Sequence, residues 1–262
     1  MIDRRTIAIT LTSLILLVVI VFPMTSMFGY AAEKGFKVFI KELISPASLF
    51  SLRFSIMLAA STALINMILG LIVAVSLTRY NFMGKSILNA IVDLPIAVPT
   101  AVTGFTLLLL YGPLGYVGSS LKRLGIDVMF AFPGILLAHI FVTFPFMVRT
   151  IQPVLTEFEK IYEEAAATLG ASSWQTFRHI ILPSIMPGII SGSVLAFSRS
   201  LGEFGSTIMV SGNIAMRTQT APLYIFSKFN TGDFSAACAM AIVLAMISFI
   251  MLLLITFMRK RV

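Results

Sequence analysis

Charged residues are scarce in this chain, and their scarcity excludes most water-soluble folds. Asp, Glu, Lys and Arg make up 11% of its 262 residues, whereas soluble domains carry about 25%. The single cysteine, Cys238, excludes an intrachain disulfide, and two isolated histidines, His139 and His179, do not make a metal centre. A Gly-x-x-x-x-Gly-Lys-Ser/Thr phosphate loop is also missing. We therefore expect no metal and no cofactor bound by this chain.

Apolar sequence is abundant instead. Hydrophobic residues make up 58% of the chain, and its mean hydropathy is +0.99. Several apolar segments reach the roughly 20 residues that a helix needs to cross a bilayer, where the backbone must satisfy its own hydrogen bonds. We predict an all-α membrane protein in which residues 1–262 form one transmembrane domain of six helices. The predicted spans are 6–28, 53–78, 88–111, 129–153, 184–210 and 235–258.

The net charge of +8 comes from basic residues scattered over the ends of the spans, without the patch that a nucleic-acid partner would need. The lipid bilayer is the expected surrounding. An even number of spans places both termini on one side, and basic residues favour the cytoplasm, so both termini are predicted to be cytoplasmic in a cell-membrane protein. A cleaved signal peptide is the alternative for the first span, but no small-x-small site follows it. The terminal basic residues are Arg4, Arg5, Arg259, Lys260 and Arg261.

The main polar segment is an insert at residues 156–183, between the fourth and fifth spans. Thr156 with Glu159 and Ser172 with Gln175 have the spacing of helix capping boxes. Gly170 lies between them, where the end of a helix favours a residue that tolerates positive φ. We predict two short helices with a turn at Leu169–Gly170, and a break at Pro183 where the chain re-enters the membrane.

The same insert resembles the cytoplasmic signature loop of ABC importer permeases. The resemblance lies in Glu164-Ala165-Ala166, three further residues, Gly170, nine residues, then Ile180, Leu182 and Pro183. It implies the fold of a type I ABC importer permease, in which the first helix of the insert docks on an ATPase subunit as a coupling helix. The residues expected to serve this coupling are Glu163, Glu164, Ala165, Ala166, Ala167, Gly170 and Pro183.

Two further segments resemble permeases for tetrahedral oxyanions. Residues 93–104 are similar to the proline-rich third span of sulfate, molybdate and tungstate permeases. The fifth span and following loop of the same group resemble residues 199–205, 212–214 and 217–220. The sequence of these residues is closest to that of the molybdate/tungstate members. The resemblance implies a translocation pathway for molybdate or tungstate, with a sulfate/thiosulfate permease as the alternative.

Polar and proline residues in these segments are the candidates for the pathway or its gate. Two prolines four residues apart are expected to bend the third span, and two threonines there can either bond an oxyanion or satisfy the kinked backbone. Arg199 and Glu203 are spaced to pair on one helix face, either as a structural ion pair or with Arg199 contacting the anion. The candidates are Pro95, Pro99, Thr100, Thr103, Arg199 and Glu203.

Three other features carry expectations of their own. Asp93 is expected to mark a helix end. The stripe of small residues Gly188, Gly192, Ala196 and Ser200 predicts close packing, against a sister subunit, another helix of the same chain or the pore. The loop 211–233 is expected outside the cell, either as an ordinary polar loop or with donors for a docked protein or passing anion. Its candidate residues are Asn213, Arg217, Thr218 and Gln219.

The resemblance also implies an assembly. The chain is expected to form a homodimer with two ABC ATPase subunits, which bind ATP-Mg, and an extracytoplasmic oxyanion-binding protein. A membrane enzyme is the alternative class, but few ionisable groups are available in the spans to act as catalytic residues, and we predict none. A secondary carrier would often show paired broken helices, and only one strongly proline-broken span is present. Neither alternative explains the insert.

Overall fold

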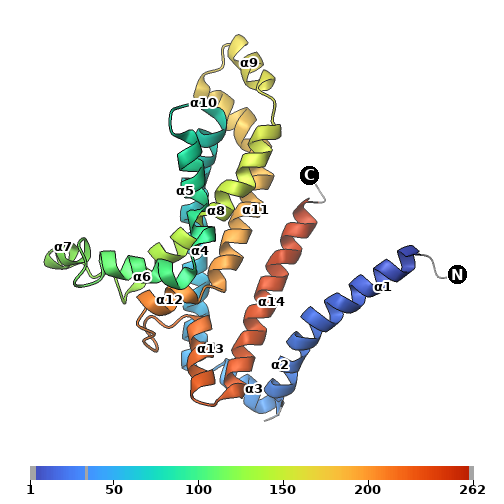
Figure 1. Cartoon of the computed structure of the whole chain (residues 1–262), viewed down its shortest axis with the longest axis vertical. Helices are drawn as coiled ribbons and strands as arrows, with labels where there is room; N and C mark the ends of the chain where they lie inside the picture. The colour runs from blue at the N-terminus through green and yellow to red at the C-terminus, as the bar shows by residue number, and fades with distance from the viewer. Residues whose placement is uncertain (1–3, 33–34, 260–262) are drawn as a thin grey trace.

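The computed structural model describes residues 4–32 and 35–259, and every regular element in those residues is a helix. The all-helical architecture confirms the predicted fold class (Figure 1). In chain order the elements are α1 (Arg4–Leu16), η1 (Leu17–Val21), α2 (Phe22–Ala32), α3 (Phe36–Leu43), α4 (Pro46–Arg79), α5 (Lys85–Ala97), α6 (Thr100–Tyr111), α7 (Gly118–Arg123), α8 (Phe132–Glu157), α9 (Ile161–Thr168), α10 (Ser173–Thr176), η2 (Phe177–Ile181), α11 (Leu182–Leu201), α12 (Gly205–Val210), α13 (Ala221–Asn230) and α14 (Phe234–Arg259).

Among the described residues, five helical stretches are long and apolar enough to cross a membrane, and the bent pair α5–α6 makes six if it is counted as one span. The chain bends by 108° between the two helices of this pair. The continuous stretches are Arg5–Ala31, Pro46–Arg79, Phe132–Glu157, Ser173–Leu201 and Phe234–Leu254.

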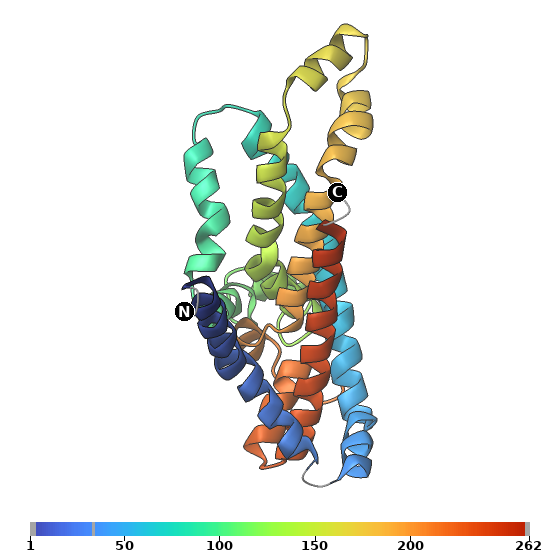
Figure 2. The same cartoon turned by 90° about the vertical axis from the view of Figure 1, so that its right-hand side faces the viewer.

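Helices α4, α8 and α11 form the centre of the molecule (Figures 1 and 2). Met147 of α8 is fully buried between glycines of its two neighbours. A Cβ atom on Gly70 of α4 would lie 2.6 Å from the Met147 side chain, and one on Gly192 of α11 would lie 2.7 Å from its sulfur. In lipid, dispersion and close fit hold helices together, so small residues at these crossings matter more than hydrophobic burial.

The small-residue stripe of α11 faces α8 of the same chain. Gly188 lies against the Thr150 carbonyl, 3.1 Å from where its Cβ would stand, and Gly192 lies against Met147. Ala196 and Ser200 are buried on the same side. Of the surroundings left open by the sequence, the stripe therefore packs against a neighbouring helix.

The molecule is elongated, with α9 at one end and α3 and α13 at the other (Figure 1). We call these the α9 end and the α13 end. The most apolar part of the stretch Arg5–Ala31 is not buried. Helix α1 stands away from the bundle (Figure 1), while α2 contacts α14. Helix α14 runs from the α13 end toward the α9 end.

The third predicted span bends at Pro99, whereas Pro95 remains inside α5. Val98, the residue before Pro99, is extended with φ −87° and ψ 131°, because a proline ring disfavours helical geometry in the residue that precedes it. The fifth predicted span also differs from expectation: its helix ends at Leu201, and the chain turns at Gly202 before the separate helix α12.

The predicted helix break at Pro183 is wrong. One continuous helix runs from Ser173 to Leu201. The π-helical turn η2 comes directly before the proline, and the Leu182 N–H donates to the Phe177 carbonyl five residues back. A π turn inserts one extra residue into the helix. The proline ring is thereby accommodated in the first turn of α11 without a break.

Candidate functional site

The insert folds as two short helices joined by a turn. Gly170 has φ +86° after the end of α9, the conformation that a glycine after a helix favours. Ser172 and Gln175 form the predicted capping box, with the Gln175 side chain accepting from the Ser172 N–H at 2.8 Å. The box predicted at Thr156 and Glu159 is wrong: Thr156 lies inside α8 and donates to the Gln152 carbonyl at 2.9 Å.

The residues expected to couple to an ATPase do not all face outward. Glu164, Ala165 and Ala167 are exposed on α9, whereas Ala166 is buried against the protein. Pro183 is exposed, but it lies on α11. Large apolar side chains surround the exposed face of α9, which is typical of a protein–protein contact. They are Ile161, Tyr162, Leu169 and Trp174.

Glu163 is held by Arg79, the last residue of α4. The Arg79 guanidinium lies 2.7 Å from the Glu163 carboxylate and also donates to the Phe158 carbonyl at 3.2 Å. Sequence reasoning missed Arg79, because its partner is 84 residues away and no local spacing joins them. A basic residue in the last turn of a helix was the available signal, and such residues commonly serve the helix dipole alone.

A second cluster ties α5 to α8 near the α9 end. Arg149 donates from two nitrogens to the Asp93 carboxylate, at 2.7 and 2.5 Å, and from Nη1 to the side chains of Asn89 and Gln152. We call these four residues the Arg149 cluster. Asp93 lies inside α5, so the expectation that it marks a helix end is wrong. Arg149 and Asn89 help to line a polar hollow of about 830 Å³ that also includes Arg79.

A buried polar network joins four helices in the middle of the bundle. The two ring nitrogens of His139 lie 2.7 Å from the Ser200 hydroxyl and 2.8 Å from the Thr207 hydroxyl. These contacts connect α8 to α11 and α12. On the other side, Thr143 donates to the His139 carbonyl and accepts from Asn66 of α4, both at 2.7 Å. Within the described residues, no cluster suited to a metal ion is found.

The predicted ion pair between Arg199 and Glu203 is confirmed, with a separation of 2.6 Å. The Glu203 side chain is 1% exposed, whereas that of Arg199 is 35% exposed. Glu203 also accepts from the Ser206 N–H at 2.9 Å and from its hydroxyl at 3.0 Å. The carboxylate is therefore an internal anchor, and the guanidinium extends from it toward the surface of the chain.

The two candidate threonines lie at the bend between α5 and α6, next to α12. A Cβ atom on Gly205 would come within 2.2 Å of the Thr100 hydroxyl, so Thr100 packs on the start of α12. Thr103 is buried, and its hydroxyl has no hydrogen-bond partner among the described residues. It therefore does not satisfy the kinked backbone, one of the two roles left open by the sequence.

In the loop expected outside the cell, most of the candidate polar side chains form hydrogen bonds within residues 211–233. Thr218 is buried and donates to the Ser211 carbonyl at 2.6 Å. Gln219 is buried and donates to Asn213 at 3.0 Å and to Ser227 at 3.1 Å. These contacts favour the first of the two roles left open by the sequence for Thr218, Gln219 and Asn213, that of an ordinary polar loop. Arg217 alone of the four candidates is exposed.

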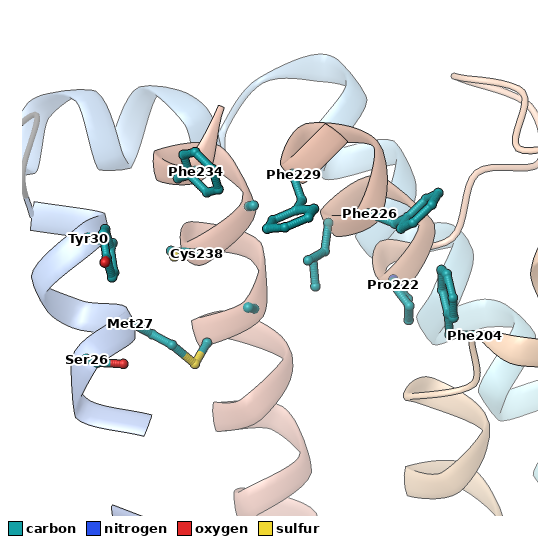
Figure 3. Close-up of a pocket in the computed structure, with 12 residues that line it drawn as sticks. Ser26, Met27, Tyr30, Phe204, Pro222, Phe226, Phe229, Phe234 and Cys238 are labelled. Carbon is teal, nitrogen blue, oxygen red and sulfur yellow. The ribbon is translucent and has the colours of Figure 1, made fainter. Parts of the chain in front are cut away.

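A groove of about 820 Å³ at the α13 end is not suited to an anion. Figure 3 shows Met27 and Tyr30 of α2 on one side of α14, and Phe226 and Phe229 of α13 on the other. Its lining is almost entirely apolar, and a dianion placed there would lose its hydration without gaining partners. Of the predicted pathway and loop candidates, none lines this groove.

Comparison with known proteins identifies the family. Residues 66–262 match the family described as "Binding-protein-dependent transport system inner membrane component". The Sulfate transport system permease protein CysT of Escherichia coli (strain K12) is 36% identical over 256 residues, which cover 98% of this chain and 92% of that protein. The Probable sulfate transport system permease protein cysT of Chlorokybus atmophyticus is 40% identical over 250 residues, covering 95% and 87%.

Solved structures share the fold at lower identity. A chain of a bacterial ABC transporter involved in the import of the acidic polysaccharide alginate superposes with a TM-score of 0.80 at 19% identity, covering 97% of this chain and 94% of that one. A chain of the MetNI methionine ABC transporter gives 0.59 at 15% identity, covering 83% and 99%. The described helices and the family match agree: this chain belongs to the inner-membrane components of binding-protein-dependent transport systems, the permeases of ABC importers.

Proposed function

We propose that two copies of this chain form the translocation pathway of an ATP-driven sulfate importer. The observation that carries the substrate is the relatives named as sulfate permeases, which are 36–40% identical across almost the whole chain. This reverses the order expected from the sequence motifs, in which molybdate or tungstate came first. These anions share a tetrahedral shape and a double negative charge. Molybdate or tungstate remains the second candidate because the sequence of residues 199–220 resembles that of molybdate/tungstate permeases.

As a permease component, the chain is not itself the ATPase, and the transporter includes an ATPase and a periplasmic binding protein. We propose that the ATPase docks on α9 through the exposed side chains of Glu164, Ala165 and Ala167 and the apolar residues around them. The α9 end then faces the cytoplasm, with both termini on that side, and the α13 end receives the binding protein. Closure of two ATPase subunits would push the two copies of α9 together and reorient the membrane helices.

Arg199 is the proposed anion contact. Its guanidinium is anchored by buried Glu203 and remains 35% exposed, so it can offer further N–H donors to a passing oxyanion. Thr103, whose hydroxyl has no partner among the described residues, is a second candidate donor at the Pro99 bend. Weak and transient contacts suit this role, because a pore that bound its anion tightly would not release it, and the binding protein supplies the selectivity.

The test is ATP-dependent uptake into liposomes that hold this chain, its ATPase and its binding protein. Equimolar sulfate, molybdate and tungstate are offered together, and accumulated S, Mo and W are counted by elemental mass spectrometry. We expect sulfur to dominate, and omission of the binding protein to abolish uptake. Dominance of Mo or W would transfer the assignment to the second candidate. Sustained ATP hydrolysis without accumulation of any of the three would overturn the oxyanion proposal.

A further inference from the structure

Two neighbouring carboxylates at the start of α9 have different surroundings. Glu164 is exposed on the face proposed to meet the ATPase. Glu163 is only 25% exposed and pairs with Arg79 of α4. The resemblance to the signature loop groups both with the docking surface, but the contacts separate them.

Arg79 holds both α9 and the segment that leads into it. Its side chain is 10% exposed, and Nη2 contacts the Glu163 carboxylate at 2.7 Å and the Phe158 carbonyl at 3.2 Å. Its guanidinium carbon lies 5.8 Å from the centre of the Phe158 ring, which stacks on Tyr162 of α9 at 5.4 Å. A planar guanidinium can make these contacts together, whereas a lysine ammonium is a single point of charge.

This attachment matters because the connections on both sides of α9 are short and non-helical. Residues 158–160 link it to α8, and residues 169–172 link it to α10. Segments of this kind absorb φ/ψ changes when packed elements move. Arg79 bridges the first connection and joins α9 to α4, which packs along both α8 and α11. A displacement of α9 therefore reaches all three central helices.

We propose that Arg79 is a positioning residue for energy coupling: through Glu163 and Phe158 it fixes α9 to α4, so that movement of the docked ATPase moves the membrane helices. Glu164 serves docking of the ATPase, and Glu163 serves transmission of its movement to the membrane helices. This inference rests on the proposed function, because it requires that the ATPase docks on α9.

The test uses the complete transporter in liposomes and three readouts: co-purification of the ATPase, the rate of ATP hydrolysis, and the number of sulfate ions imported per ATP. We expect Arg79→Gln and Glu163→Gln to retain the ATPase and to lower sulfate import per ATP by about five-fold or more. Arg79→Lys should fall between Arg79→Gln and the unmodified protein. The exchanged pair Arg79→Glu with Glu163→Arg should recover part of the loss.

Two control variants separate the roles. Glu164→Gln should weaken co-purification of the ATPase, because it changes the docking face. Lys85→Gln should leave all three readouts unchanged, because Lys85 contacts Asn81 at 3.2 Å and not α9. If Arg79→Gln does not fold, Glu163→Gln carries the same expectation, since it changes a partly exposed side chain on a surface helix.

The outcomes are distinct. Unchanged sulfate import per ATP in well-folded Glu163→Gln would overturn the inference. Loss of the ATPase from Arg79→Gln, to the same degree as from Glu164→Gln, would also overturn it, because Arg79 would then act in docking. If substitutions on the exposed face of α9 leave ATPase attachment intact, the proposed docking function fails, and the role of Arg79 in transmission fails with it.

Discussion

At the scale of single residues, the two ionisable side chains His139 and Glu203 are buried inside the bundle and bonded to polar partners. His139 has a hydroxyl partner at each ring nitrogen, and Glu203 is bonded to both Arg199 and Ser206. Ionisable groups within membrane helices are costly and usually face a protein interior or a cavity. These hydrogen bonds and the ion pair explain how His139 and Glu203 can stay buried in the bundle.

Replacement of His139 should test the buried polar network. His139→Leu leaves the Ser200 and Thr207 hydroxyls without their shared partner, so we expect a loss of about 1–3 kcal/mol in unfolding free energy. His139→Gln can still bond one hydroxyl and should lose less. Equilibrium unfolding in detergent measures both. Equal stability of His139→Leu and the unmodified protein would show that these contacts do not stabilise the bundle.

The ion pairs Arg199–Glu203 and Lys228–Asp233 differ in burial and can be compared directly. Arg199→Met leaves Glu203 buried without its cation, and we expect a loss of about 3 kcal/mol. Lys228→Met breaks the pair with Asp233, in which both side chains are partly exposed, and should cost about 1 kcal/mol or less. The same unfolding measurement decides. Similar losses in the two variants would contradict the role of Glu203 as an internal anchor.

Sequence patterns predicted the local ion pair and missed two ion pairs that join separate helices. Arg199 and Glu203 lie four residues apart, a spacing that predicts pairing directly, and the pair forms across the end of α11 at Leu201. Arg79 and Glu163 come from different helices, as do Arg149 and Asp93. Such pairs depend on how the helices are placed in space, which no local spacing encodes.

At the scale of elements, α6 and α12 approach each other closely at Gly104. A Cβ atom on Gly104 would lie 2.5 Å from the Ser206 carbonyl and 2.8 Å from its Cα. Both are backbone atoms, which cannot rotate away as a side chain can. Gly192, in contrast, meets the flexible end of Met147.

Alanine substitutions should rank by what each new methyl group meets. Gly104→Ala should be the most harmful, costing about 1–3 kcal/mol because α12 must shift. Gly192→Ala should cost less, because Met147 can change rotamer. Gly202→Ala should be nearly neutral, since its nearest atom is 3.9 Å away. Thermal unfolding of the three variants checks the order, and a Gly202→Ala variant as damaged as Gly104→Ala would refute it.

Helix ends were predictable where a side chain caps them. Ser172, Gln175 and Gly170 have residue types whose local geometry favours a start or a turn, and the structure contains both. The continuity of the helix through Pro183 was not predictable, because proline normally ends a helix and the π turn that accommodates it has no simple sequence pattern. The wrong box at Thr156 has a related cause: α8 extends past it to Glu157.

At the scale of the whole molecule, the two ends differ in what they present. The α9 end carries exposed apolar residues of the insert, and the α13 end carries a loop closed by its own hydrogen bonds. This asymmetry fits a protein with different partners on the two sides of a membrane. Composition alone predicted the membrane class, whereas the proposed substrate rests on relatives named as sulfate permeases.

Reporter fusions test the proposed orientation. A fluorescent protein fused to the carboxyl terminus should fluoresce, because it folds in the cytoplasm, and alkaline phosphatase fused after Asn230 should be active, because it requires export. Fusions of the opposite reporters at the same two sites provide the controls. Phosphatase activity from the carboxyl-terminal fusion would reverse the orientation and place α9 outside.

The unbroken helix through Pro183 has a mechanical consequence. Its 29 residues, from Ser173 to Leu201, form a lever about 43 Å long at 1.5 Å per residue, and a tilt of about 5° at one end sweeps the other by about 4 Å. Ser200, near the far end, is bonded to His139 at 2.7 Å. This hydrogen bond cannot lengthen by the distance of the sweep. A tilt of this size therefore either breaks the bond or moves α8 together with α11. A small displacement beside α9 is thereby linked to a hydrogen bond in the middle of the bundle.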